Sequence, residues 1–105
     1  MLFVLDPCQR KIQEFPEEIR GDLADALARL DAGQTLSMPL SRAMPDIGPG
    51  VHELRLKDRS GAYRVIYFLA HAGNIYLLHA FKKNTRTTSQ RDLNLARRRL
   101  REINR

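Results

Sequence analysis

The sequence has one cysteine, no tryptophan and no long uninterrupted hydrophobic segment. The single cysteine, Cys8, excludes an intrachain disulfide. The most hydrophobic stretch, residues 62–81, is interrupted by Arg64, two histidines, Gly73 and Asn74, which predicts two strands rather than a membrane span. The first residues also lack the charged, hydrophobic and small-residue regions of a secretory signal. These absences favour a cytoplasmic protein with no membrane association.

Metal and nucleotide sites also lack their usual signals. The three histidines, His52, His71 and His79, are not spaced as metal ligands and have no cysteine or acidic cluster beside them. The glycines at 48–50 precede a predicted strand, whereas a phosphate-binding loop follows one. The sequence therefore predicts neither a metal site nor a cofactor.

Length and composition predict one soluble domain that spans residues 1–105. The chain is 43% hydrophobic and 29% charged, which is ordinary for a globular protein and unlike a disordered or membrane chain. A chain of this length buries roughly two thirds of the surface that its unfolded form exposes. We therefore expect a single hydrophobic core.

The first part of the chain predicts a short strand followed by a helical hairpin. Hydrophobic residues at 1–5 stop at Asp6 and Pro7, a pair typical of a helix start. An apolar stripe continues to Pro16, which ends one helix and begins the next. Gly33 then marks the end of the second helix. The apolar face of that helix is predicted to consist of Ile19, Leu23, Ala26, Leu27 and Leu30.

The second part predicts a loop, three strands and a final helix. Residues 34–50 contain three prolines and are expected to form the loop. Short connections that contain glycine or asparagine join the next three apolar segments, so we expect an antiparallel meander. Its strands are predicted at 51–57, 62–70 and 75–81. Ser89, followed three residues later by Asp92, indicates the start of a terminal helix.

Positive charge is concentrated at the end of the chain. The formal net charge is +6, and residues 82–105 alone hold nine basic and two acidic groups. The remaining residues, 1–81, hold nine basic and ten acidic groups. A local excess of this kind attracts polyanions such as RNA.

Basic residues on the predicted strands indicate an anion site. Alternation places Glu53, Arg55 and Lys57 on one face of their strand. Arg64 lies inside the most apolar strand, so it either pairs with a carboxylate such as Glu53 or faces an anionic ligand. Lys82, Lys83 and Arg86 add positive charge where the last strand ends. Planar and cationic donors suit phosphate binding, and the alternative is a solvated basic edge.

Several short motifs occur in an order that resembles a known family. The residues that carry the resemblance are Met44-Pro45, Gly48-Pro49-Gly50-Val51, Glu53-Leu54-Arg55, Gly61-Ala62-Tyr63-Arg64-Val65-Ile66-Tyr67, Leu78-His79-Ala80-Phe81, Thr85, Thr88, Ser89 and Arg91-Asp92-Leu93. The chain resembles the HigB-like, phage-derived branch of the RelE/ParE toxin superfamily of bacterial toxin–antitoxin modules. It departs from the usual pattern of that branch at Asn84 and Thr87, where lysines are common.

The resemblance implies a fold and a reaction. The fold is an α+β domain of order β-α-α-β-β-β-α, with an antiparallel sheet, a helical hairpin and a basic C-terminal helix. The activity is that of a ribosome-dependent endoribonuclease, in which a ribose 2′-hydroxyl attacks the adjacent phosphate without a metal. The basic catalytic positions fall on Arg55, Arg64 and Lys83. The candidate acid and base groups are His52, Glu53 and His79, and the sequence does not choose among them.

The resemblance also implies partners. The toxin would act on the ribosome and its messenger RNA and would be neutralised by a cognate antitoxin, expected to be a small helix-turn-helix protein. RNA contacts are predicted at Lys57, Lys82, Arg86, Arg91, Arg97 and Arg98. The alternative is a non-catalytic or gyrase-targeting ParE-like protein that an antitoxin neutralises.

Overall fold

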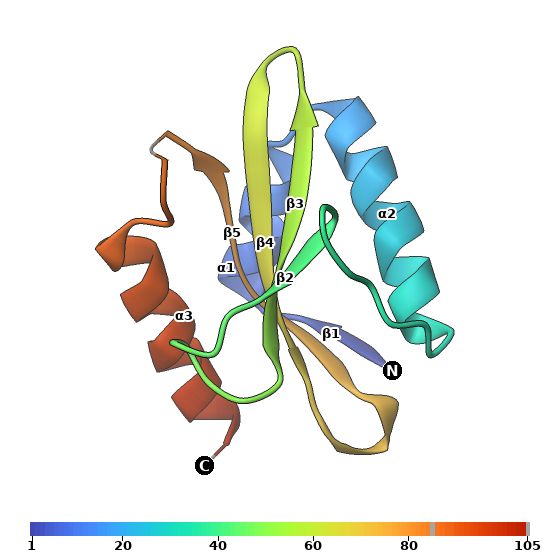
Figure 1. Ribbon diagram of the computed structural model, residues 1–105, viewed down its shortest axis with the longest axis vertical. Helices are drawn as coiled ribbons and strands as arrows, with labels where there is room; N and C mark the ends of the chain where they lie inside the picture. Colours follow the sequence, from blue (N-terminus) through green and yellow to red (C-terminus); the bar gives the residue numbers. More distant parts are fainter. Residues whose placement is uncertain (85, 105) are drawn as a thin grey trace.

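The computed structural model describes residues 1–84 and 86–104, so Thr85 of the family motif and Arg105 of the basic segment lie outside the described residues. Three helices surround a central sheet (Figure 1). They are α1 (Asp6–Gln13), α2 (Glu17–Asp31) and α3 (Gln90–Ile103). The predicted helical hairpin and terminal helix are confirmed.

Five strands form one sheet in the order β1-β5-β4-β3-β2. The strands are β1 (Leu2–Val4), β2 (Ser41–Ala43), β3 (Val51–Asp58), β4 (Gly61–Leu69) and β5 (Ile75–Lys83), with a short 3₁₀ turn at His71–Gly73. The predicted meander is the antiparallel run of β3, β4 and β5. The sheet as a whole is mixed rather than antiparallel, because β1 pairs in parallel with β5.

Strand β2 lies in the segment that the sequence predicts to be a loop. It pairs antiparallel with β3 and forms the outer edge of the sheet. Pro39 and Pro45 flank it, and proline is tolerated beside a short edge strand. The Ser41 hydroxyl and the Tyr67 hydroxyl, both buried, lie 2.6 Å apart in a hydrogen bond. These contacts hold β2 in place despite the prolines.

The two faces of the sheet have separate hydrophobic clusters. Helices α1 and α2 cover one face, which we call the hairpin face, and α3 covers part of the other, which we call the α3 face (Figure 1). Buried residues of the hairpin face include Ile19, Leu23, Leu54, Val65 and Leu77. Those of the α3 face include Val51, Ile66, Leu78, Phe81, Ala96 and Leu100. The sheet is therefore buried on both sides, except where α3 begins.

The start of α3 follows the predicted capping pattern. The backbone N–H of Asp92 donates to the Ser89 hydroxyl oxygen at 3.2 Å, and the Ser89 hydroxyl donates to the Asp92 carboxylate at 2.6 Å. Leu93, Ala96, Leu100 and Ile103, spaced three or four residues apart, pack on the sheet. This cap sets the start of α3, and the part of the α3 face beyond that start is not covered by the helix.

Candidate functional site

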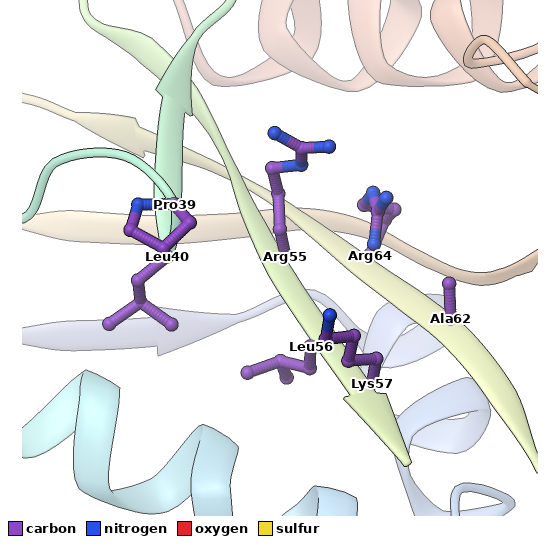
Figure 2. Close-up of a pocket in the computed structure, with 7 residues that line it drawn as sticks. All are labelled: Pro39, Leu40, Arg55, Leu56, Lys57, Ala62 and Arg64. Carbon is purple, nitrogen blue, oxygen red and sulfur yellow. The ribbon is translucent and has the colours of Figure 1, made fainter. Parts of the chain in front are cut away.

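Two arginines lie side by side on the α3 face, beyond the beginning of α3. Arg55 of β3 and Arg64 of β4 are directly paired in the strand register. Lys83 of β5 is paired with Ala62, one step further along the same face. The guanidinium groups of Arg55 and Arg64 project to the same side of the sheet (Figure 2). The three predicted basic catalytic positions therefore share one face.

A buried ion pair forms the base of this site. The Arg64 Nε lies 3.4 Å from Glu53 Oε1, and the two residues are only 6% and 2% exposed. The Thr88 hydroxyl donates to Glu53 Oε2 at 2.7 Å. Arg64 also donates from Nη1 to the carbonyl oxygen of Tyr63, but its Nε has no hydrogen-bond partner among the described residues. Arg64 thus pairs with Glu53, and its Nε is buried against that carboxylate.

The site carries more positive than negative charge. Burial lowers the pKa of the Lys83 amine first, and the nearby charges of Arg64, Arg55 and Arg42 lower it further, against the raising effect of Glu53. Burial likewise lowers the pKa of Arg64, and Glu53 opposes this change. We call Arg42, Arg55, Arg64 and Lys83, gathered around Glu53, the cationic cluster. Four cations around one carboxylate favour the binding of an anion.

The sequence did not identify Arg42 as a member of this cluster. Arg42 is paired with Glu53 in the register of β2 and β3, which places it on the same face. It lies in a proline-rich segment with no strand alternation, so no periodicity pointed to it. The only sequence signal is that Arg42 is the single basic residue between Arg29 and Arg55.

A hollow of about 330 Å³ adjoins the cationic cluster beside the end of β3 that β2 does not pair with (Figure 2). Its lining combines apolar side chains with the cations and consists of Pro39, Leu40, Arg55, Leu56, Lys57, Ala62 and Arg64. Arg55 is held beside it by a contact of 3.4 Å from Nη1 to the sulfur of Met38. A flat group attached to a bound phosphate would have room here.

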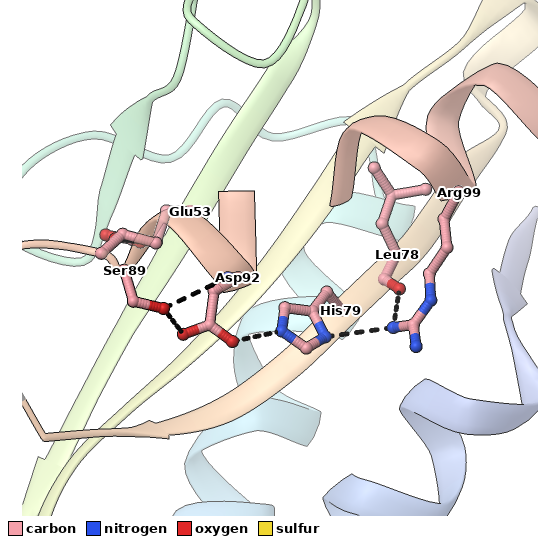
Figure 3. Close-up of polar contacts among 7 residues, drawn as sticks. Glu53, Leu78, His79, Ser89, Asp92 and Arg99 are labelled. Atoms are coloured by element: carbon pink, nitrogen blue, oxygen red, sulfur yellow. Dashed lines mark hydrogen bonds and ion pairs between the residues drawn. The ribbon is translucent and has the colours of Figure 1, made fainter. Parts of the chain in front are cut away.

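His79 lies apart from the cationic cluster, beneath α3. Its Nε2 is 2.7 Å from the Asp92 carboxylate, and its Nδ1 accepts from Arg99 Nη1 at 3.0 Å (Figure 3). Arg99 also donates to the carbonyl oxygen of Leu78 at 2.8 Å. These contacts assign the neutral tautomer with the proton on Nε2. Both ring nitrogens are thus engaged in holding α3 on β5. His52 stacks on Tyr67 at 5.4 Å.

The environment of His79 predicts a pH dependence of stability. Burial lowers its pKa below the ordinary 6.5, Asp92 opposes this, and Arg99 and Arg91 reinforce it. Because the unfolded chain binds the proton more readily, stability should fall as the pH drops from 6.5 through the pKa of the folded state. The urea midpoint should therefore decrease more between pH about 7.5 and about 5.5 in the unmodified protein than in His79→Gln. An equal decrease in both proteins would assign the pH dependence to other groups. Burial also lowers the pKa of His52, and this contribution to the pH dependence is the same in the unmodified protein and in His79→Gln.

The predicted RNA-binding residues divide into two groups. Arg86, Arg91 and Arg98 are exposed, as is Lys57 at the edge of the hollow. Arg97 instead donates from Nε and Nη2 to the carbonyl oxygen of Asp46 at 3.2 and 3.0 Å. Lys83 points to the α3 face and Lys82 to the hairpin face. The Lys82 amine lies 5.8 Å from the ring centre of Tyr63. Only part of the basic segment is therefore free to meet a polyanion.

Other reactive groups do not extend the site. Burial raises the pKa of the Cys8 thiol to about 12, so this cysteine is a poor nucleophile. Within residues 1–84 and 86–104, no three His, Cys, Asp or Glu side chains are grouped as metal ligands. In the same ranges, no helix has the length and hydrophobicity needed to span a membrane.

Comparisons with known proteins bear on the family and the fold. The profile of the family described as "Phage derived protein Gp49-like" matches residues 10–101. The crystal structure of the isolated RelE toxin of E. coli superimposes with a TM-score of 0.56 at 17% identity, covering 93% of this chain and 96% of that one. A double mutant of E. coli RelE in the free state gives a TM-score of 0.48 at 16% identity, over 78% and 81% of the two chains. No curated protein matches the sequence.

Proposed function

Because the chain belongs to the family of phage-derived Gp49-like proteins and has the fold of the RelE toxin, we propose that it is the toxin of a type II toxin–antitoxin module. Its activity in this proposal is cleavage of messenger RNA on the ribosome, which inhibits translation. Residues 1–105 act as one domain, and a cognate antitoxin, a small helix-turn-helix protein, neutralises it. The observation that carries the proposal is the cationic cluster around Glu53, which has the charge and the donors for a phosphodiester.

The cluster supports a cleavage that uses only protein side chains. The ribose 2′-oxygen attacks the adjacent phosphorus, and Arg55 and Arg64 stabilise the charge that develops on the phosphate oxygens. Lys83, whose pKa is lowered, gives a proton to the 5′-oxygen as the phosphorus–oxygen bond breaks. The products are a 2′,3′-cyclic phosphate and a 5′-hydroxyl.

Glu53 is the acceptor for the proton of the 2′-hydroxyl. Of the three candidate acid and base groups, only Glu53 lies in the cationic cluster, where it forms the ion pair with Arg64. Since Glu53 is only 2% exposed, the proton reaches it through Thr88, which accepts it while passing its own hydroxyl proton to Glu53 Oε2. Arg42 and Lys57 bind the flanking phosphates.

Mapping RNA ends after induction of the protein tests this function. We expect new 5′-hydroxyl ends within translated messenger RNA and growth arrest, both suppressed when the antitoxin is expressed. Growth arrest with intact messenger RNA and gyrase-dependent DNA breaks would support the gyrase-targeting alternative instead. The measurement therefore separates a nuclease from a protein that only binds.

The exposed arginines of α3 should make ribosome binding dependent on salt. Each phosphate contact contributes roughly 0.7–0.9 to the slope of log affinity against log salt concentration. Replacing both Arg98 and Arg101 with glutamine should reduce this slope by roughly 1.4–1.8. Arg10→Gln with Arg29→Gln removes the same charge from exposed positions of α1 and α2 and should leave the slope unchanged. An equal slope in all three proteins would show that Arg98 and Arg101 do not contact RNA.

A further inference from the structure

The first turn of α3 is joined to two strands of the sheet at once. The Thr88 hydroxyl, one residue before the helix N-cap Ser89, donates to Glu53 Oε2 of β3 at 2.7 Å. The Asp92 carboxylate accepts from His79 Nε2 of β5, also at 2.7 Å (Figure 3). Strands β3 and β5 are not neighbours, because β4 lies between them. The start of α3 therefore connects the proton acceptor of the proposed reaction with a histidine on a different strand.

The Asp92 carboxylate is held through both of its oxygens. Its Oδ1 accepts from His79, and its Oδ2 accepts from the Ser89 hydroxyl at 2.6 Å. The Ser89 hydroxyl oxygen in turn accepts from the backbone N–H of Asp92 at 3.2 Å. This last bond is sufficient for a helix cap. The bond from His79 therefore adds something that the cap does not supply, which is a fixed position of the turn on β5.

Arg99 sets the direction of the bond between His79 and Asp92. Arg99 Nη1 donates to His79 Nδ1 at 3.0 Å and to the carbonyl oxygen of Leu78 at 2.8 Å. Because Nδ1 is an acceptor, the proton of the neutral ring is on Nε2, where it faces the carboxylate. His79 is only 8% exposed, so the ring has little room to reorient. Arg99, His79 and Asp92 thus form a support that runs from β5 to the first turn of α3.

We propose that His79 and Asp92 are positioning residues for RNA cleavage, because they hold the turn that keeps the Thr88 hydroxyl within reach of Glu53. This inference rests on the proposed function, in which Thr88 passes a proton to Glu53. His79 itself lies apart from the cationic cluster, so it acts on the reaction only through Thr88. Proton transfer needs a donor and an acceptor at hydrogen-bond distance. Displacement of Thr88 therefore slows the reaction and leaves phosphate binding by the cationic cluster intact.

Two substitutions of His79 test this role. Glutamine offers an N–H to Asp92 and an oxygen to Arg99, whereas leucine offers neither. His79→Leu should lower the single-turnover rate of cleavage of ribosome-bound messenger RNA about tenfold. His79→Gln should keep most of the rate, and both variants should bind the ribosome as tightly as the unmodified protein. An unchanged rate in His79→Leu would overturn the proposal, and so would an equal loss in both variants.

A double variant shows whether His79 acts through Thr88. Thr88→Val removes the hydroxyl and nearly keeps the shape of the side chain, and the proposed proton transfer predicts a loss of about 100-fold. Adding His79→Leu to Thr88→Val should then lower the rate by less than about twofold. A further tenfold loss would mean that His79 acts by another route and would overturn the proposal.

Leu100→Ala is the matched control for loosening of α3. Leu100 packs on the sheet in the last turns of the helix and does not belong to the hydrogen-bonded support. Well below its unfolding temperature, Leu100→Ala should cleave RNA at the rate of the unmodified protein. If its rate fell as far as that of His79→Leu, any weakening of α3 would slow cleavage, and His79 would have no positioning role.

The ¹³C signal of the Glu53 carboxylate tests the positioning without RNA. In labelled full-length protein, Thr88→Val should shift this signal, because it removes a hydrogen bond to Oε2. His79→Leu should shift it in the same direction, and His79→Gln and Leu100→Ala should not. An unchanged Glu53 signal in His79→Leu would overturn the proposal. The expected shifts in a protein that does not cleave RNA would instead support the positioning of Thr88 and contradict the proposed function.

Discussion

Replacing Arg64 with glutamine is expected to lower the rate of RNA cleavage by about 100- to 1,000-fold, the usual effect of removing one preorganised donor to a developing negative charge. Arg64 is the most buried cation of the cationic cluster, and its Nε has no hydrogen-bond partner among the described residues. The ion pair with Glu53 holds the guanidinium on the α3 face beside Arg55, where it would stabilise charge on a phosphate oxygen. The rate of cleavage of ribosome-bound messenger RNA measures the effect.

The same substitution also affects the fold, and a second variant separates the two effects. Without Arg64, the buried Glu53 carboxylate loses its ion-pair partner, which costs about 3–5 kcal/mol when a buried pair is broken. The double variant Arg64→Gln with Glu53→Gln should regain much of that stability and remain inactive. Arg10→Gln, which removes an exposed charge from α1, should retain full activity. Normal cleavage by Arg64→Gln would make this arginine purely structural.

The sequence predicts the elements whose patterns are strong. Apolar spacing identified α2, and alternation with short glycine-containing connections identified β3, β4 and β5. Strand β2 has only three residues between two prolines, so it has no pattern of its own and depends on pairing with β3. The parallel pairing of β1 with β5 also depends on tertiary contacts, because the two strands are separated by most of the chain.

The candidate site was partly predictable for the same reason. Alternation within β3 places Glu53 and Arg55 on one face, and the short hairpin sets Arg55 opposite Arg64. Arg42 joins the cationic cluster only through the register of β2, which the sequence does not specify. The opposite directions of Lys82 and Lys83 follow from alternation once β5 is known to continue through both residues.

A count of basic residues in the terminal helix does not distinguish arginines that make structural contacts from arginines that are exposed. The arginine triplet at 97–99 is continuous in sequence, but its three side chains have different surroundings. Arg97 joins α3 to the segment before β3, and Arg99 joins α3 to β5. Arg98 alone of the three is exposed. Part of the positive charge therefore holds the helix on the sheet, and sequence alone cannot assign which arginines do so.

Replacing Leu23 with alanine is expected to lower the free energy of unfolding by about 2–5 kcal/mol, a large share of the stability of a small domain. Leu23 is 3% exposed and packs in the cluster of the hairpin face with Leu54 and Val65. The lost contacts and the remaining cavity both contribute to the cost. Urea denaturation of the purified protein measures the change.

Leu27 of the same helix provides the matched control. The sequence assigned both leucines to one apolar face, but Leu27 is only half-buried, so Leu27→Ala should cost distinctly less than Leu23→Ala. Because α2 lies on the opposite face from the cationic cluster, cleavage by folded Leu23→Ala should be unchanged well below its unfolding temperature. A loss for Leu23→Ala below about 0.5 kcal/mol, the range typical of surface substitutions, would contradict the packing of α2 on the sheet. A loss of cleavage in the folded variant would instead mean that the hairpin face helps to shape the cationic cluster through the strands that the two faces share.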